Sequence, residues 1–277
     1  VYDIDSHACI VDGVRLHVGK RFTFQHNDIE SLEKNIIRAQ KIVDKTGGGI
    51  LVISEGVFGM RGEQGKIKEI VELKKKYDFR LLVDDAHGFG TLGDDGSGVG
   101  KEQNVMDDID VYFATFAKSL ASTGAFVAGS KNVIKFLKYN MRSQMFAKSL
   151  QMQLVVGAIK RLEILKNEPQ HREKLWKNVK ALQTGLVKSG FDIGTTKSCV
   201  TPVFLKGDVP EAMVLVKDLR EKYNIFCSIV VYPVIPKGLI LLRLIPTATH
   251  TIEDINETLD SFLAIRDKLQ NGYYKKL

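Results

Sequence analysis

The sequence has few of the residues that define disulfide-rich, metal-binding or membrane-spanning proteins. Only three of its 277 residues are cysteines, Cys9, Cys199 and Cys227, and their wide spacing predicts neither a disulfide framework nor a CxxC metal site. No apolar run approaches the roughly 20 residues that a membrane-spanning helix needs. The start of the chain also lacks the basic and apolar pattern of a signal peptide. We therefore expect a cytoplasmic protein without metal or transmembrane segments.

The charge of the chain does not single out one kind of partner. The net charge is +7 and the isoelectric point is about 9.1, which alone would suit a nucleic acid, a membrane surface or an anionic substrate. Lysine and arginine alternate with acidic residues along the chain, without aromatic platforms or a basic arm, so nucleic-acid binding is not expected. A solvated surface explains the excess charge, and a basic rim would also suit the phosphates of an acyl-coenzyme A.

Four polar residues follow two short apolar runs. Asp84 and His87 come after the run at 81–83, and Thr115 and Lys118 come after the run at 111–114. Such runs are typical of buried parallel strands. Because ligands of open α/β sheets bind outside the carboxyl ends of the strands, we expect the four side chains to lie in one crevice.

An acid, an imidazole, a hydroxyl and an amine together suit pyridoxal phosphate chemistry. The Lys118 amine can hold the aldehyde as a Schiff base, and the Asp84 carboxylate can keep the pyridine nitrogen protonated. A hydroxyl just before the lysine can bind the phosphate. The same residues also fit a simpler interpretation, in which Asp84 and His87 cap turns and Lys118 is a solvated side chain. The spacing alone leaves both interpretations open.

Six segments spread along the chain carry a resemblance to a known family. The sequence resembles the α-oxoamine synthases, which are fold-type I pyridoxal phosphate enzymes, and within that family it is most similar to the bacterial serine palmitoyltransferases. The segments are DIDSHACIVDG at 3–13, EGVFGMRG at 55–62, VDDAHGFGTLGDDGSG at 83–98, TFAKSLASTGAFVAG at 115–129, NEPQHREKLWKN at 167–178 and LRLIPTATHT at 242–251.

The resemblance implies a role for each residue of the predicted crevice. Lys118 would bind the cofactor and then act as the base that removes the α-proton of the amino acid. Asp84 would contact the pyridine nitrogen, and His7 would stack on the ring. His87 and Thr115 would contact the ring oxygen and the phosphate.

The resemblance also implies a substrate residue and a second subunit. Arg243 would bind the carboxylate of the amino acid, whereas the alternative is an edge strand with its charge in water. Segment 145–149 would reach across a homodimer to the partner's cofactor phosphate, which places the active site at the subunit interface. We expect Lys148 to make that contact, although a solvent-facing Lys148 is an equally open alternative.

The sequence departs from the family pattern at three places. Gly59 and Ala147 stand where the family usually has serines, and the loss of one hydrogen bond to the cofactor would cost about 1 kcal/mol. The family's N-terminal part, with a glycine-bearing phosphate loop, has no counterpart in the sequence. These departures favour a non-catalytic family subunit, whereas Lys118 and Asp84 favour an enzyme.

The expected fold is an α/β, fold-type I pyridoxal phosphate transferase with two domains. Residues 1–168 would form the large cofactor domain, a mostly parallel sheet with flanking helices, and residues 169–277 a smaller α+β domain. A helix from about 29, capped by Asn27 or Asp28, and a last helix capped by Thr251 follow from apolar spacing and cap residues.

The implied reaction is a decarboxylating Claisen condensation of a small L-amino acid with an acyl-coenzyme A to give an aminoketone. L-Serine with palmitoyl-coenzyme A, giving 3-ketosphinganine in sphingolipid biosynthesis, is the first expectation. The alternatives within the family are 8-amino-7-oxononanoate synthase and glycine C-acetyltransferase. The expected location is the cytoplasm or the periphery of the inner membrane.

Overall fold

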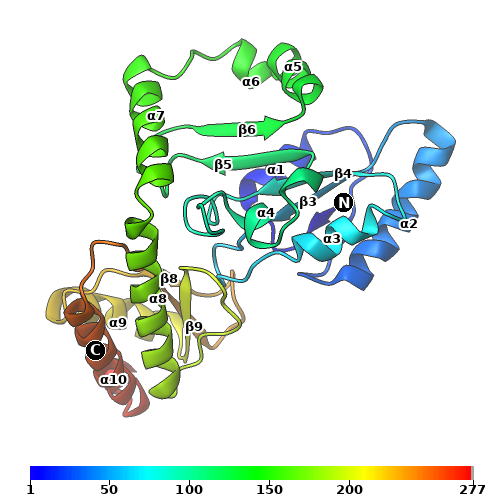
Figure 1. Cartoon of the computed structure of the whole chain (residues 1–277). Helices are drawn as coiled ribbons and strands as arrows, with labels where there is room; N and C mark the ends of the chain where they lie inside the picture. The colour runs from blue at the N-terminus through cyan, green and yellow to red at the C-terminus, as the bar shows by residue number, and fades with distance from the viewer. Residues whose placement is uncertain (276–277) are drawn as a thin grey trace. The chain divides into compact units, whose positions relative to one another are not determined.

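The protein, analysed as a computed structural model that describes residues 1–275, has two compact units (Figure 1). The first contains residues 1–58 and 64–169, and the second contains residues 59–63 and the chain from 170 onward. The sequence placed a boundary at Glu168. It assigned residues 59–63 to the first domain, whereas the structure groups them with the second.

A six-stranded sheet forms the centre of the first unit. Its order is β2-β1-β3-β4-β5-β6, and only β6 is antiparallel to its neighbour. The apolar runs form the central strands because side chains on both faces of a parallel sheet are covered. The predicted mostly parallel sheet is therefore confirmed. The strands are β1 (Tyr2–Asp3), β2 (Thr23–Phe24), β3 (Leu51–Glu55), β4 (Arg80–Asp84), β5 (Val111–Thr115) and β6 (Ala125–Gly129).

The helices of the first unit follow the apolar spacing of the sequence. The Asp28 side chain accepts a hydrogen bond from the Ser31 amide and caps the first long helix, whose Leu32 and Ile36 are fully buried. No helix within residues 1–275 combines the length and apolar character needed to cross a membrane. The elements are α1 (Ala8–Arg15), α2 (Ile29–Thr46), α3 (Ile67–Leu73), α4 (Val99–Glu102), η1 (Met106–Asp108), α5 (Lys131–Asn140), α6 (Arg142–Met145) and α7 (Met152–Asn167).

The second unit packs helices against a three-stranded antiparallel sheet of order β7-β9-β8. Phe262, Leu215 and Leu242 are fully buried in its core. Thr251 and Asp254 form the capping box that begins the last helix, as the sequence predicted. The elements are α8 (Gln170–Lys188), β7 (Thr201–Lys206), α9 (Val209–Lys222), β8 (Ser228–Val230), β9 (Leu239–Leu244), α10 (Ile252–Gln270) and η2 (Tyr273–Lys275).

Hydrogen bonds explain why residues 59–63 belong to the second unit. The Gly62 carbonyl accepts from the Lys197 amide at 3.1 Å and from the Thr196 hydroxyl at 3.2 Å, and the Thr195 hydroxyl donates to Glu63. Gly62 has a φ of +68°, and a Cβ atom there would lie 2.3 Å from the Val200 carbonyl oxygen. Only glycine fits this close approach without a shift of the backbone.

A buried carboxylate in the second unit predicts a specific acid sensitivity. Asp218 is 6% exposed and accepts from Lys268 Nζ at 2.7 Å and Tyr274 Oη at 2.9 Å, with Lys222 Nζ 2.7 Å away. These hydrogen bonds lower the pKa of Asp218 to about 2, although burial acts in the opposite direction. The stabilisation is therefore complete above the unfolded pKa near 3.8 and is lost as the pH falls towards 2.

We expect Asp218→Asn to lower the free energy of unfolding at pH 7 by about 1–3 kcal/mol, because two lysines lose a charged acceptor. The difference from the parent should shrink as the pH falls from 4 to 2. Denaturant unfolding at several pH values measures it, with exposed Asp260→Asn as the control. An equal loss of stability at pH 2 and pH 7 would contradict this assignment.

Candidate active site

Three polar side chains end neighbouring strands of the first unit. Glu55, Asp84 and Thr115 are the last residues of β3, β4 and β5, and Glu55 lies opposite Asp84 in the strand register. His87 and Lys118 follow in the turns after β4 and β5. The strands thus deliver these residues to one edge of the sheet, where α/β proteins bind ligands.

Asp84 lies within electrostatic reach of Lys118 and His7. Asp84 is only 6% exposed, and one of its carboxylate oxygens accepts a hydrogen bond from the Ala86 amide at 3.0 Å. Burial raises the pKa of Asp84, whereas the Ala86 amide and the charges of Lys118 and His7 lower it. The structure therefore brings Lys118 and His7 within electrostatic reach of Asp84; the strand ends predicted His87 as the imidazole beside Asp84, and only the family resemblance placed His7 in the site.

The neighbouring Asp85 has a structural role. It is fully buried, and its Oδ2 accepts from Tyr112 Oη and the Val99 amide, both at 2.7 Å. Burial raises the pKa of Asp85 to about 7. The loop packs so tightly that a Cβ atom at Gly56, Gly88 or Gly98 would lie within about 2 Å of this carboxylate. Asp85 thus fixes the loop that carries His87.

His7 begins α1 as its N-cap, and its Nδ1 lies 3.0 Å from the Cys9 sulfur. The His7 amide donates to Glu55 Oε1 at 2.5 Å. Glu55 is 6% exposed, and its burial raises its pKa to about 8. Sequence reasoning missed Glu55 as a site residue, although an acid after the apolar run 51–53 repeats the pattern at Asp84.

The turn after β5 holds Thr115 and Lys118. The Thr115 hydroxyl donates to the Gly124 carbonyl at 3.2 Å and accepts from the Ala117 amide at 3.1 Å. Lys118 is exposed, and its carbonyl accepts from the Ala121 amide at 3.0 Å. These bonds fix the backbone from which the Lys118 side chain extends.

His87 is half-buried in the loop after β4, and its carbonyl accepts from the Thr91 hydroxyl at 3.1 Å. The structure does not bring Lys148 to the cluster. Lys148 is exposed between α6 and α7 and makes no hydrogen bond or ion pair with the described part of the chain. Its predicted contact with a cofactor phosphate therefore stays a prediction.

Arg243 lies in β9 of the second unit. β9 is the middle strand of its sheet, so the alternative of an edge strand is wrong. The buried Nε atom of Arg243 has no hydrogen-bond partner, and Nη1 contacts only the Met60 sulfur, at 3.5 Å. Within residues 1–275 the guanidinium forms no ion pair, which is the arrangement expected of a residue that binds an anionic ligand.

The residues of the first unit fit pyridoxal phosphate by their chemistry. The cofactor needs a carboxylate for its ring nitrogen, an amine for its aldehyde and a flat group for its ring, and Asp84, Lys118 and His7 supply these. Among residues 1–275, no group of three or more histidine, cysteine or acidic residues is arranged to hold a metal ion.

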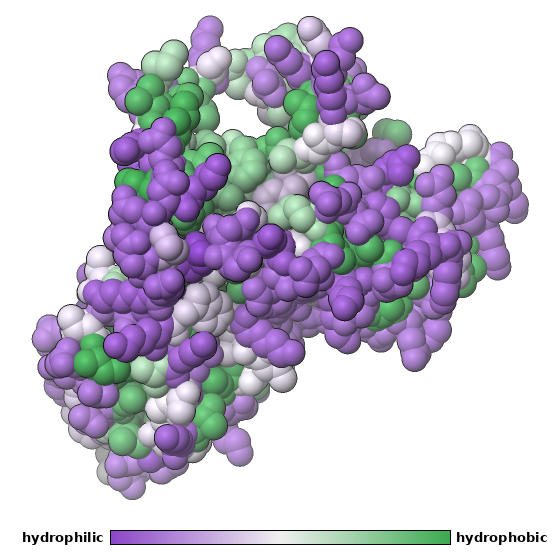
Figure 2. Space-filling view, viewed as in Figure 1, coloured by the Kyte–Doolittle hydropathy of each residue, from purple (hydrophilic) through white to green (hydrophobic). Residues whose placement is uncertain are grey.

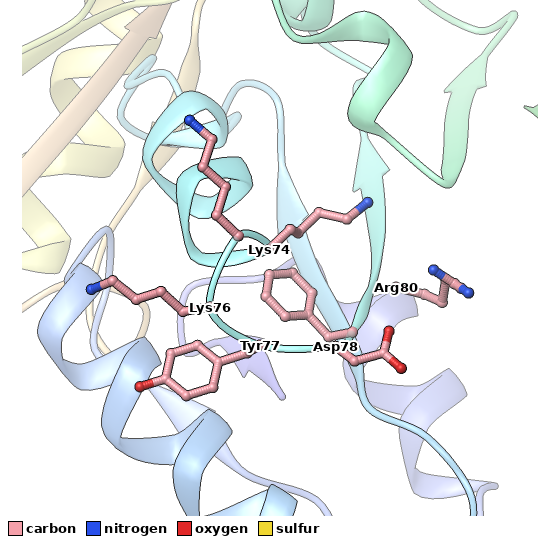
Figure 3. A pocket seen from close by; sticks show the side chains of 7 residues that line it. Lys74, Lys76, Tyr77, Asp78 and Arg80 are labelled. Atoms are coloured by element: carbon pink, nitrogen blue, oxygen red, sulfur yellow. The ribbon is translucent and has the colours of Figure 1, made fainter.

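A basic hollow at residues 74–80 is not a candidate anion site (Figure 3). Lys74 Nζ lies 2.6 Å and Arg80 Nη1 3.7 Å from Asp110, and Lys76 Nζ lies 3.4 Å from Glu33. The labelled cationic side chains extend in different directions rather than towards one point. Their charges are already paired with carboxylates.

The sequence profile of the family "Aminotransferase class I and II" matches residues 1–262. The chain is 68% identical over 277 residues to a cysteate-C-fatty acyltransferase from Capnocytophaga ochracea. It is 36% identical over 263 residues to a serine palmitoyltransferase from Sphingobacterium spiritivorum, and 37% identical over 264 residues to an 8-amino-7-oxononanoate synthase from Petrotoga mobilis. These matches cover 100%, 95% and 95% of this chain, and 66%, 64% and 66% of those relatives.

Solved structures agree with these relatives. A serine palmitoyltransferase from Sphingomonas wittichii superposes with a TM-score of 0.88 at 33% identity, covering 95% of this chain and 65% of that chain. A serine palmitoyltransferase structure that contains pyridoxal phosphate gives the same TM-score, identity and coverage. The chain thus spans about two thirds of the length of these relatives.

Proposed function

Because this chain belongs to the aminotransferase class I and II family, we propose that it binds pyridoxal phosphate through Lys118 and joins a fatty acyl group to a small amino acid. The observation that carries the proposal is the electrostatic cluster of Asp84, Lys118 and His7 at the carboxyl ends of the strands. Support for the acyl transfer comes from relatives named as acyltransferases or as serine palmitoyltransferases.

The bound cofactor supplies an electron sink that stabilises negative charge on the α-carbon of the amino acid. Asp84 then holds a proton on the pyridine nitrogen through its carboxylate. Lys118 Nζ would bind the aldehyde of the cofactor and, as a free amine, would serve as the general base that takes the α-proton of the amino acid.

Three further residues orient the cofactor in this proposal. His7 stacks on the ring, and His87 contacts the ring oxygen. Thr115 contacts the phosphate. To do so, its hydroxyl gives up its hydrogen bond to the Gly124 carbonyl and donates to a phosphate oxygen instead. These contacts would limit the motion of the ring and so would fix its orientation relative to the amino acid.

The proposed overall reaction breaks one bond in each substrate and forms one carbon–carbon bond. The amino acid loses its carboxylate as carbon dioxide, the acyl group forms a new carbon–carbon bond at the α-carbon, and coenzyme A leaves as the thiol. We propose L-cysteate as the amino acid, since the relative named for it is 68% identical to this chain, against 36% for a serine palmitoyltransferase. L-Serine with palmitoyl-coenzyme A, which the sequence predicted, is the second candidate.

An exposed apolar surface supports a homodimer. The helices α5 and α6 bury no residue, and Figure 2 shows hydrophobic residues on the surface around α7. A second copy of this chain would cover such a surface, because monomers rarely leave large contiguous apolar patches in water. Lys148, in the loop between α6 and α7, would then reach the partner's cofactor phosphate. The large side chains that are more than half exposed include Phe136, Tyr139, Met145, Phe146, Met152 and Ile159.

The experiment that tests this function is a titration of the cofactor-loaded protein with L-cysteate, L-serine, L-alanine and glycine, followed by its visible absorption spectrum. L-Cysteate is expected to shift the band at the lowest concentration. Adding palmitoyl-coenzyme A should then release carbon dioxide and the free thiol in equal amounts. A response to L-serine at lower concentration would favour the second candidate, and no response to any amino acid would contradict the proposal.

Arg243→Ala is expected to raise the KM for the amino acid by about 10- to 100-fold, because a carboxylate would lose a charge-assisted hydrogen bond. The absorption of bound cofactor should change little. Steady-state kinetics measure the effect, and Arg220→Ala on the exposed face of α9 is the matched control. An unchanged KM would contradict the assignment of Arg243.

A further inference from the structure

We propose that Glu55 is a positioning residue: its carboxyl group ties the His7 backbone to the end of β3 and so fixes the His7 imidazole beside Asp84. This inference rests on the proposed function, since it concerns the same site. The geometric basis is the hydrogen bond from the His7 amide to Glu55 Oε1 and the pairing of Glu55 with Asp84 in the strand register.

The Glu55 bond is the link between His7 and the sheet. The other hydrogen bonds of His7 stay within α1: Nδ1 contacts Cys9, and the carbonyl accepts from the Ile10 and Val11 amides. The imidazole itself is exposed, so packing does not fix it. Among the described residues, the position of His7 relative to Asp84 therefore depends on Glu55 and on the path of residues 1–6.

The surroundings of Glu55 favour its neutral form. Asp84 on β4 and Asp3 on β1 face it with negative charge, and Lys118 from the turn after β5 faces it with positive charge. Cys9 on α1 is also within electrostatic reach. Burial is the largest influence and raises the pKa of Glu55 to about 8. At neutral pH Glu55 is therefore protonated and adds no charge of its own beside Asp84 and Asp3.

Ionisation of Glu55 should have two opposite effects. A carboxylate is the stronger acceptor for the His7 amide, but it also places a second negative charge next to Asp84. Two carboxylates in one site compete for a proton. We therefore expect ionised Glu55 to raise the pKa of Asp84 further and cofactor binding to change as the pH rises through about 8, and no such change when residue 55 is an amide.

The test compares Glu55→Gln, which keeps a neutral acceptor, with Glu55→Ala, which leaves the His7 amide without one. Glu69→Gln, at an exposed position of α3, is the control. The readouts are hydrogen exchange of the His7 amide and its proton chemical shift against pH in the cofactor-free protein, and then the affinity for pyridoxal phosphate.

In the parent, the His7 amide proton should shift with a midpoint near pH 8. Glu55→Gln should abolish the shift but keep the amide protected and the cofactor affinity within about threefold, whereas Glu55→Ala should speed exchange and weaken the cofactor about tenfold or more. The pH dependence of cofactor binding near pH 8 should vanish in Glu55→Gln.

Two kinds of failure are distinguishable. If the parent binds the cofactor but Glu55→Ala leaves the His7 amide protected and the affinity unchanged, the role of Glu55 is wrong and the proposed function stands. If the parent binds no cofactor while its His7 amide proton still shifts with a midpoint near pH 8, the proposed function fails and the role of Glu55 stands. A loss of cofactor in Glu55→Gln equal to that in Glu55→Ala would also overturn the positioning role, because the amide should restore it.

Discussion

Lys118→Ala is expected to abolish the visible absorption of covalently attached cofactor and to lower turnover by roughly a thousandfold or more, because one amine both binds the aldehyde and removes the α-proton. Lys118 is exposed, so its truncation should change the free energy of unfolding by no more than about 0.5 kcal/mol. Absorption spectra and steady-state turnover measure the first effect, and denaturant unfolding measures the second.

The control for this substitution is Lys41→Ala, which removes an exposed lysine from α2. It should retain both the absorption band and the turnover. If Lys118→Ala kept the band, the cofactor would be attached elsewhere. If it lost the band together with its fold, the result would place Lys118 in the structure rather than in the chemistry, contrary to its exposure.

Asp84→Asn is expected to lower turnover by roughly a hundredfold or more, because an amide cannot hold a proton on the pyridine nitrogen and preorganised charge contributes strongly to catalysis. Its free energy of unfolding should stay unchanged or rise. Burial raises the pKa of Asp84, so the folded state holds the proton more tightly than the unfolded state, and the neutral amide removes a cost that grows as the pH rises.

Asp85→Asn provides the matched comparison for Asp84→Asn. Asp85 is fully buried and accepts two hydrogen bonds through Oδ2, whereas its buried Oδ1 has no partner, so the amide nitrogen of asparagine would be a buried donor without an acceptor. We expect it to lower the free energy of unfolding by about 1–3 kcal/mol. Equal kinetic defects with equal stability in the two variants would contradict the division of roles between them.

The sequence predicted the strands that deliver the site because their apolar runs stand out from the charged segments around them. The runs before Asp84 and Lys118 became β4 and β5, and the cap residues Asp28 and Thr251 begin the helices expected of them. Periodicity and capping depend only on residues close together in the sequence, so both can be identified without knowing the rest of the fold.

What the sequence could not show depends on contacts between distant segments. Spacing does not separate Asp84 from Asp85; the resemblance selected Asp84, and the structure supplies the reason, since Tyr112 holds Asp85. The link from His7 to Glu55 joins residues 48 positions apart. The grouping of residues 59–63 with the second unit depends on bonds to residues near 196. Local patterns carry no information on such pairs.

Chemical reduction of the cofactor-loaded protein with borohydride, followed by peptide mass spectrometry, identifies the amine that binds the cofactor. Borohydride fixes the cofactor to the amine that holds it. We expect a single modified residue, Lys118, and no modification in Lys118→Ala. A cofactor fixed to another lysine, or none fixed to any lysine after incubation with pyridoxal phosphate, would contradict the assignment of this site.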